Sequence, residues 1–269
     1  MRRTVSLLLS CAIAASSPTT ASSTAPPTTC ELGHARPLPT SRDVPEPANA
    51  YELADGSVVF RGHLSIDADG SPRAYHPQSA LGQDRLGNGG VPGNWWAIAT
   101  NRPDCGPSGT PIIQGAHDPA PGFYVSTTSL QRAGVSCRSP SKYVDASTIP
   151  YVALSPAMRG SFLASEGHLA IVRDTRTNHT AFAIFADGGP RTGRGEGSMA
   201  LAQALGLNPD ARHGGASARE LVFLVLPAGI GFPTSRQQIE DAGRSAFHDW
   251  GDEQRLAACA VRLDAVEHR

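Results

Sequence analysis

The sequence predicts a mainly β protein of the α+β class, built as a single compact β-barrel domain with helices near its C-terminal end. Short apolar runs separated by Gly, Pro, Asn and Asp fill most of the chain, which is typical of strands joined by turns. Helix patterns come only late, and no low-complexity break or internal repeat divides residues 51–269. Dominant strands with few helices favour a barrel with helical decoration.

Seven segments have the composition of strands. Two of them, 168–173 and 181–186, flank the polar stretch 174–180 and are expected to form a hairpin. The other expected strands are 57–61, 95–100, 122–127, 150–154 and 221–226.

Three helices are expected in the last third of the chain. Ser198 can cap a first helix, which Gly206 would end. Ser235 and Gln238 form a capping box for a second helix, and a third is expected over 252–265.

The N-terminal segment predicts export. In residues 1–25, two arginines precede an apolar core and small residues follow it, as in a signal peptide too short to span a membrane. The run "LLSC" also resembles a lipoprotein signal, so anchoring through Cys11 is a second possibility beside a secreted or periplasmic protein. No other stretch is apolar enough for a membrane span. Residues 26–50 are expected to form a Pro/Ser/Thr-rich leader, poorly ordered apart from Cys30.

The remaining cysteines agree with export. Cys30, Cys105, Cys137 and Cys259 suggest two disulfides, and their spacing does not choose among three connectivities. We favour Cys105 with Cys137 and Cys30 with Cys259, because the second pair ties the two ends of the domain together. The spacings match no zinc pattern, so we expect no metal.

Charge argues against a nucleic-acid partner. The 269 residues carry a formal net charge of −1, and the basic residues are scattered singly without a stripe. We expect a monomer whose partner is a small molecule, a polymer or another protein.

The glycine-rich stretch "ADGGPRTGRGEGS" allows two chemical interpretations. A dinucleotide fingerprint would need its glycines directly after the strand, and a P-loop would need Gly-Lys-Ser/Thr, so neither is present and no cofactor is expected. Asp187 and Glu196, nine residues apart, could instead act as the two carboxyl groups of a glycosidase. The alternative is that Asp187 starts a turn and Glu196 neutralises a helix N-terminus, whose dipole would oppose the raised pKa that a general acid needs.

Two further stretches could bind a sugar. "SIDADGSPRAYHP" lacks the closing glutamate of a calcium loop, but Asp67, Asp69, Tyr75 and His76 offer acids and an aromatic face; an Asp-Gly turn is the alternative. In "GNWWAIAT", adjacent tryptophans on a strand point to opposite faces. One is expected in the core, and we take Trp96 as the stacking platform. The common nucleophile motifs of hydrolases are absent from the sequence.

Several segments together resemble a known family. "IPYVALSP", "GHLAIV" and "AFAIFADGGPRTGRGEGSMALAQALG" are similar to the fungal-type chitosanases of glycoside hydrolase family 75 and their bacterial relatives. "DADGSPRAYHP", "GNWWAIAT" and "DPAPGFYVSTTSL" also resemble segments of that family. The similarity covers roughly residues 59–226, in order.

The resemblance implies an endo-acting, inverting hydrolase of chitosan, the polymer of β-1,4-linked glucosamine. Asp187 would be the general base and Glu196 the general acid, with carboxyl groups about 6.5–9.5 Å apart. Asp67 and Asp69 would attract and pair with ammonium groups. The implied fold is a β-barrel, with the double-psi barrel as the candidate topology.

Arg191 and Arg194 depart from what a cationic polymer would favour in this loop. They leave open a peptidoglycan or other polysaccharide hydrolase on the same scaffold. A non-catalytic carbohydrate-binding module is the alternative from another class.

Overall fold

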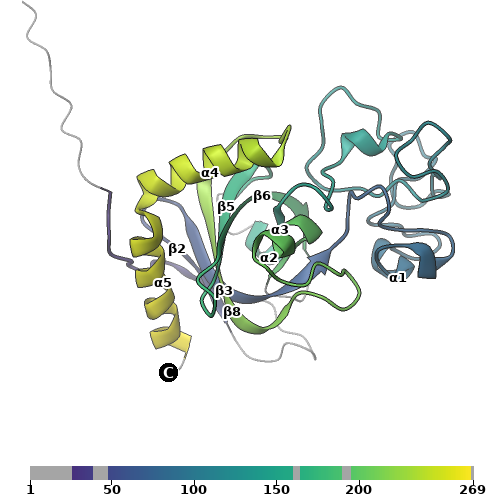
Figure 1. Ribbon diagram of the computed structural model, residues 1–269. Helices are drawn as coiled ribbons and strands as arrows, with labels where there is room; N and C mark the ends of the chain where they lie inside the picture. Colours follow the sequence, from purple (N-terminus) through teal and green to yellow (C-terminus); the bar gives the residue numbers. More distant parts are fainter. Residues whose placement is uncertain (1–25, 39–47, 160–163, 190–194, 268–269) are drawn as a thin grey trace, which may run out of the picture.

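Six strands close into a barrel in the computed structural model, which describes residues 26–38, 48–159, 164–189 and 195–267 (Figure 1). Around the barrel the order is β3-β7-β4-β6-β5-β8, and β8 pairs back with β3. The β3–β7 and β4–β6 pairs are parallel and the other barrel pairs are antiparallel. The bounds are β3 (Val58–Asp67), β4 (Tyr151–Leu154), β5 (His168–Asp174), β6 (Thr180–Gly188), β7 (Glu196–Ser198) and β8 (Ala216–Gly229). The predicted α+β barrel is therefore confirmed, including the β5–β6 hairpin.

Two more strands extend the sheet outside the barrel. β1 (Ala35–Pro37) pairs with β2 (Asn49–Glu52), and β2 pairs with β3. Both begin within the segment 26–50, for which the sequence predicted little order apart from Cys30. That expectation is wrong for the described part of the segment, because its backbone completes a sheet edge that composition does not reveal. The predicted signal peptide and Cys11 lie outside the described residues.

The late helices follow their predicted caps. The side chain of Ser198 accepts from the Leu201 N–H at the start of α3 (Met199–Ala204). The side chain of Ser235 accepts from the Gln238 N–H at the start of α4 (Arg236–Trp250), and α5 (Asp252–Glu267) follows directly. In the described part of the chain, no helix has the length and apolar character needed to cross a membrane.

Side chains alternate between the two faces of each strand, so the apolar side chains form two separate layers. On β8, Phe223 and Val225 belong to the layer that fills the barrel, where the rings of Phe223 and Phe60 stack at 4.7 Å between centroids. Val222 and Leu224 belong to the second layer, which α4 and α5 cover from outside (Figure 1). Burial on both faces explains why this strand is a continuous apolar run in the sequence.

A loop-rich segment, 68–149, lies beside the barrel (Figure 1). The strands predicted at 95–100 and 122–127 are wrong: these residues make only isolated bridges, such as Ile98 with Ser126. Their backbone groups pair within the segment, as in the bond from the Ala99 N–H to the Val125 carbonyl at 2.9 Å, because prolines and glycines interrupt longer pairing. Short helices are η1 (Ser79–Leu81), α1 (Leu86–Gly89), η2 (Pro140–Lys142) and, after β4, α2 (Pro156–Arg159).

Both favoured disulfides are present. Cys105–Cys137 joins two parts of the loop-rich segment, with Cα atoms 6.0 Å apart. Cys30–Cys259 joins the leader to α5, with Cα atoms 5.0 Å apart, and so ties the two ends of the domain together. Two disulfides fit an oxidising, extracellular environment.

Candidate active site

Four acidic side chains line one cleft of about 980 Å³ between the barrel and the loop-rich segment. Asp67 ends β3, Asp69 follows in the next turn, Asp187 lies near the end of β6, and Glu196 begins β7. Asp67 and Asp187 are buried, each with 6 % of its surface exposed, whereas Asp69 and Glu196 are half-buried. All four were predicted as site residues, and the structure brings them together.

Strand register places Asp187 and Glu196 on the same face of the sheet. Ala153 of β4 pairs with Glu196 on one side and with Asp187 on the other. Two strand spacings therefore separate the two acids, which puts their Cα atoms roughly 10 Å apart. The sequence did not reveal that β4 runs between them.

A bulge in β6 turns Asp187 toward the cleft. Val152 pairs with Phe185, but the next residue of β4, Ala153, pairs with Asp187, so Ala186 is an extra residue. Phe185 packs inside the barrel, and simple alternation would point Asp187 the same way. The extra residue reverses this, in keeping with the way bulges redirect side chains next to functional sites.

Asp67 reaches the same face by ordinary alternation. Leu64 and Ile66 pack inside the barrel, so Asp67 faces outward, and its register partner is Ser198 of β7.

In the Gly-Glu-Gly-Ser run at 195–198, close packing leaves no room for a side chain at either glycine. A Cβ on Gly195, whose φ is +125°, would lie 1.9 Å from the His63 carbonyl oxygen, and one on Gly197 would lie 2.8 Å from the Tyr151 carbonyl oxygen. Ser198 accepts from the Tyr151 N–H at 3.0 Å, in addition to capping α3. Glu196 is thus held on a short strand between two glycines, just before the helix that Ser198 caps, as the sequence predicted.

The loop-rich segment orients Asp187. Its Oδ1 accepts from the N–H and the hydroxyl of Ser129, both at 2.9 Å, and from the Gly188 N–H at 2.7 Å. The Ser129 hydroxyl also accepts from the Gly188 N–H at 3.2 Å. These bonds fix the direction of one carboxyl oxygen.

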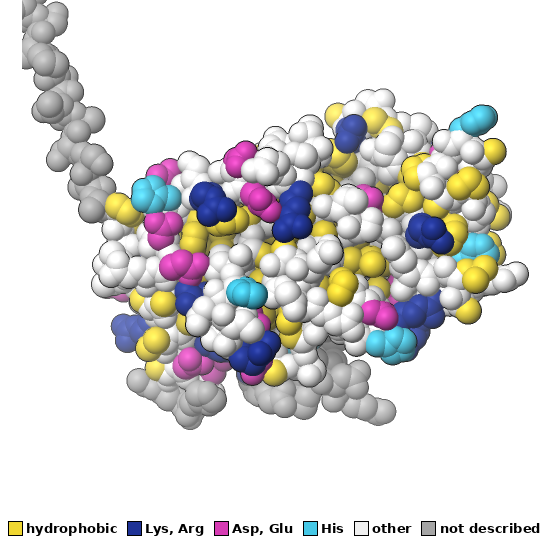
Figure 2. All heavy atoms as spheres, in the orientation of Figure 1, with side chains coloured by type: hydrophobic (Ala, Val, Ile, Leu, Met, Phe, Trp, Pro, Cys, Tyr) yellow, Lys and Arg dark blue, Asp and Glu magenta, His cyan; other side chains and the backbone are white. Residues whose placement is uncertain are grey.

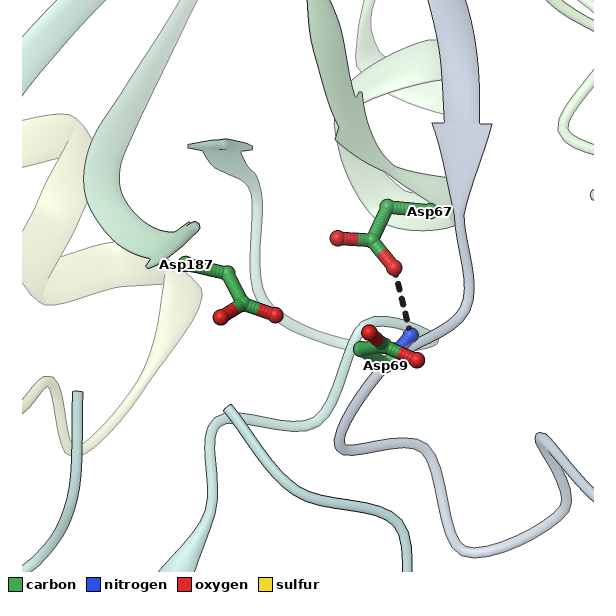
Figure 3. A group of neighbouring side chains, drawn as sticks. All are labelled: Asp67, Asp69 and Asp187. Carbon is green, nitrogen blue, oxygen red and sulfur yellow. Dashed lines mark hydrogen bonds between the residues drawn. The ribbon is translucent and has the colours of Figure 1, made fainter. Parts of the chain in front are cut away.

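Asp67, Asp69 and Asp187 face one another across the cleft floor (Figure 3). One carboxyl oxygen from each lies within 4.8 Å of the others, close enough for the three to surround a cation. The Asp69 N–H donates to Asp67 Oδ1 at 2.7 Å. The hydroxyl of buried Tyr75 donates to Asp69 Oδ1 at 2.6 Å, and that of Tyr151 donates to the Asp69 carbonyl at 3.0 Å. Tyr75 therefore supports an acid in the cleft floor.

Burial and mutual repulsion hold protons on this cluster. Burial, followed by the charge of Asp187, raises the pKa of Asp67 to about 8. Burial, then the charges of Asp67 and Asp187, raise the pKa of Asp69 and that of Glu196 well above their usual values. The raised pKa of Glu196 is the direction that a general acid requires, and it resolves the opposition of the helix dipole anticipated from the sequence.

The two tryptophans separate as predicted. Trp95 is 8 % exposed and packs in a core cluster, whereas Trp96 is 57 % exposed and lines the cleft. The Trp96 indole N–H donates to the Asn88 carbonyl at 2.7 Å, which fixes the ring.

Two predicted substrate-binding residues, Tyr75 and His76, do not line the cleft. Tyr75 is 1 % exposed and acts on the cleft only through its bond to Asp69. The ring of His76 packs edge-on against Phe123, and its Nδ1 accepts from the Gln78 N–H at 2.9 Å.

Sequence reasoning missed several polar residues around the cleft. Ser129, Asn88 and Gln131 line it, and buried Asp84 accepts from the Asn88 amide at 2.9 Å. None carries a motif; they come from the loop-rich segment, whose folding back over the barrel has no local pattern. Among the described lining residues none is basic. Arg191 and Arg194 lie outside the described residues.

On the face shown in Figure 2, acidic and basic side chains are interspersed over the surface.

In comparisons with known proteins, no family model and no curated protein matches the sequence.

Proposed function

We propose that the protein is an exported, endo-acting glycoside hydrolase that cleaves β-1,4-linked glucosamine polymers of the chitosan type with inversion. Asp187 is the general base and Glu196 the general acid. The single observation that carries the proposal is that these two carboxylates flank Ala153 on the floor of one acidic cleft.

The spacing supports inversion. An inverting glycosidase needs its carboxyl groups about 6.5–9.5 Å apart so that a water fits beside the sugar. Backbones roughly 10 Å apart, with both side chains leaning into the same cleft, suit that separation.

Two protons move in the reaction, one leaving Glu196 and another reaching Asp187. Glu196 gives its proton to the glycosidic oxygen as the bond to the anomeric carbon breaks. A water attacks that carbon from the opposite face and passes a proton to Asp187. The raised pKa of Glu196 keeps the acid protonated, and the three donors on one oxygen of Asp187 hold the base in position.

The cleft suits a cationic sugar. Its described lining carries four acids and no basic side chain, so a bound ammonium group meets no like charge there and favours the ionised form of the acids it pairs with. Trp96 presents an exposed, fixed ring at one side, where a sugar ring can stack. Secretion through the N-terminal signal belongs to the same proposal, because the polymer lies outside the cell that makes the enzyme.

The test is hydrolysis by the mature protein. Chitosan, chitin and peptidoglycan are each incubated with the wild type, Asp187→Asn, Glu196→Gln and the control Glu240→Gln of α4, which does not line the cleft. We expect new reducing ends from chitosan, a loss of about 10²- to 10⁴-fold in the two site variants and no loss in the control.

Wild-type activity in both site variants would refute the assignment of the acids. Cleavage of peptidoglycan but not of chitosan would show that peptidoglycan is the substrate. Binding of chitosan without any cleavage would make the protein a carbohydrate-binding module.

A further inference from the structure

The acidic cleft continues into a second cavity of about 370 Å³. The two cavities share four lining residues, and beyond Trp96 the second one runs along the Cys105–Cys137 disulfide. The shared residues are Asn94, Trp96, Thr127 and Gln131. A chain bound at the acids could therefore pass Trp96 and enter the second cavity.

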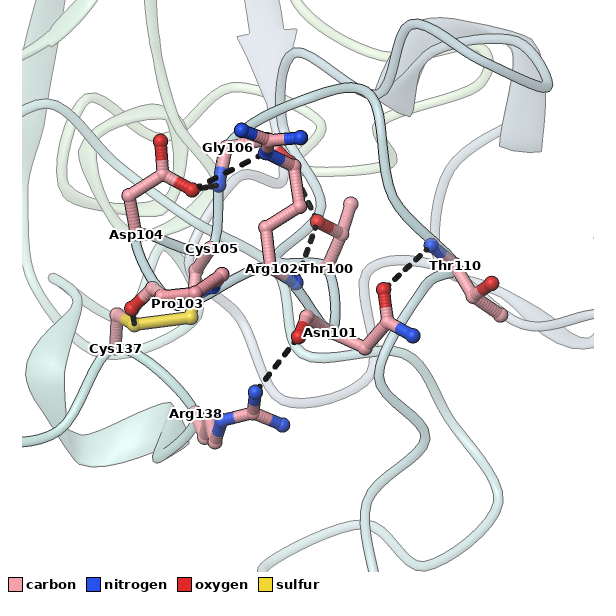
Figure 4. Close-up of polar contacts among 10 residues, drawn as sticks. All are labelled: Thr100, Asn101, Arg102, Pro103, Asp104, Cys105, Gly106, Thr110, Cys137 and Arg138. Carbon is pink, nitrogen blue, oxygen red and sulfur yellow. Dashed lines mark hydrogen bonds and ion pairs between the residues drawn. A yellow bond between two sulfur atoms is a disulfide. The ribbon is translucent and has the colours of Figure 1, made fainter.

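The wall of the second cavity is cross-linked. The disulfide joins the two loops that form it, and the hydroxyl of Tyr143 donates to the Cys137 carbonyl at 2.8 Å. Across the same loops, the Arg138 guanidinium donates to the Asn101 carbonyl at 2.8 Å (Figure 4). These links hold the cavity in shape without contacting the catalytic acids.

Asp104 places a carboxylate on this wall. Its Oδ1 accepts from the Gly106 N–H at 3.2 Å and from Arg102 Nε at 3.3 Å, while the other oxygen points away from both donors (Figure 4). The Gly106 bond lowers the pKa of Asp104, so the exposed side chain stays charged at neutral pH. Arg102 competes with any cation that approaches.

We propose that the second cavity is a distal subsite for a further glucosamine unit of the bound chain, with Asp104 pairing with its ammonium group. This rests on the proposed function. The cavity raises the affinity for chains long enough to pass Trp96 and leaves the affinity for shorter chains unchanged. It also favours a free amine over an acetylated one at that position.

The test compares chain lengths. kcat/KM is measured on fully deacetylated glucosamine hexamer and trimer for the wild type, Asp104→Asn, Arg102→Gln and a matched control, Asp118→Asn. Asp118 is an equally local acceptor, taking the Gly115 N–H at 2.8 Å, and lines neither cavity.

We expect Asp104→Asn to lower kcat/KM on the hexamer by about two- to fivefold, the size of an exposed ion pair, and to leave the trimer unchanged. Arg102→Gln should raise the hexamer value, because it removes the competing cation. Both differences should vanish at 1 M salt, where screening acts within about 3 Å. A merely structural role of Asp104 would not depend on salt.

An equal response of hexamer and trimer to Asp104→Asn, or none in either, overturns the subsite while chitosan cleavage stands. A wild type that cuts no glucosamine oligomer of any length instead refutes the proposed function, and the subsite with it.

Discussion

Asp187 and Glu196 pair with the same residue, Ala153, from opposite sides, so one strand of the barrel runs between them. Their separation is set by the spacing of β6, β4 and β7 across the sheet, and not by their nine-residue offset along the chain. A barrel wall is rigid, because each of its strands is bonded on both sides. The Cα atoms of the two acids are thus held roughly 10 Å apart, a backbone spacing compatible with the about 6.5–9.5 Å between carboxyl groups that the proposed inverting reaction needs.

Ser129 is expected to act as a positioning residue for Asp187. Ser129→Ala removes one of three donors to Asp187 Oδ1 and should lower kcat on chitosan about tenfold with little change in KM, because hydrogen bonds to charged groups contribute about 1.5–3 kcal/mol. The matched control is Ser147→Ala, which loses the same kind of bond to Asp145 at 2.6 Å outside the acidic cleft. Equal losses in both variants would show that Ser129 has only a structural role.

Asp67 should make stability depend on pH. Its pKa is about 8 in the folded protein and 3.8 for an exposed aspartate, so between these values the folded state binds more protons than the unfolded state. The resulting stability is complete below about pH 4 and is lost as the pH rises toward 8. We expect Tm to fall across this window, and to fall less steeply in Asp67→Asn.

Thermal unfolding of both proteins from pH 4 to 9 checks this, with Asp118→Asn as the control outside the cleft. Each kcal/mol lost corresponds to about 2–4 °C in a domain of this size. The same slope in the wild type and Asp67→Asn would contradict the role given to Asp67.

The two disulfides should contribute unequally to stability. Cys30–Cys259 closes a loop with a sequence separation of 229, against 32 for Cys105–Cys137, so chain entropy gives upper values of about 5 and about 4 kcal/mol. Urea unfolding should show a larger loss for the Cys30→Ser/Cys259→Ser double variant. Its cleavage of chitosan should remain, because neither cysteine lines the cleft. A larger loss from the Cys105→Ser/Cys137→Ser pair would contradict this order.

Local patterns in the sequence predicted what local physics decides. The caps at Ser198 and Ser235 and the β5–β6 hairpin follow from short-range composition and spacing. Spacing left the role of Asp187 and Glu196 open, and only the family resemblance favoured them as an acid–base pair. The favoured pairing of Cys30 with Cys259 is also confirmed, although spacing alone did not select it.

The long-range geometry of the site could not be predicted from the sequence. The bulge at Ala186 depends on how β6 meets β4, and two of the three donors on Asp187 come from Ser129, 58 residues earlier in the chain. The strand predicted at 95–100 has the right composition, but its neighbours along the chain provide no continuous partner. β7 has only three residues, too few for a periodic pattern to identify it.

The stereochemistry of cleavage tests the central claim most directly, because it depends on the separation of Asp187 and Glu196. Proton NMR of a chitosan oligomer mixed with the wild-type protein records which anomer of the new reducing end appears first, before mutarotation mixes the two. The proposed geometry predicts the α-anomer from the β-linked substrate. First appearance of the β-anomer would mean retention through a covalent intermediate, and would contradict a base and an acid that hold a water between them.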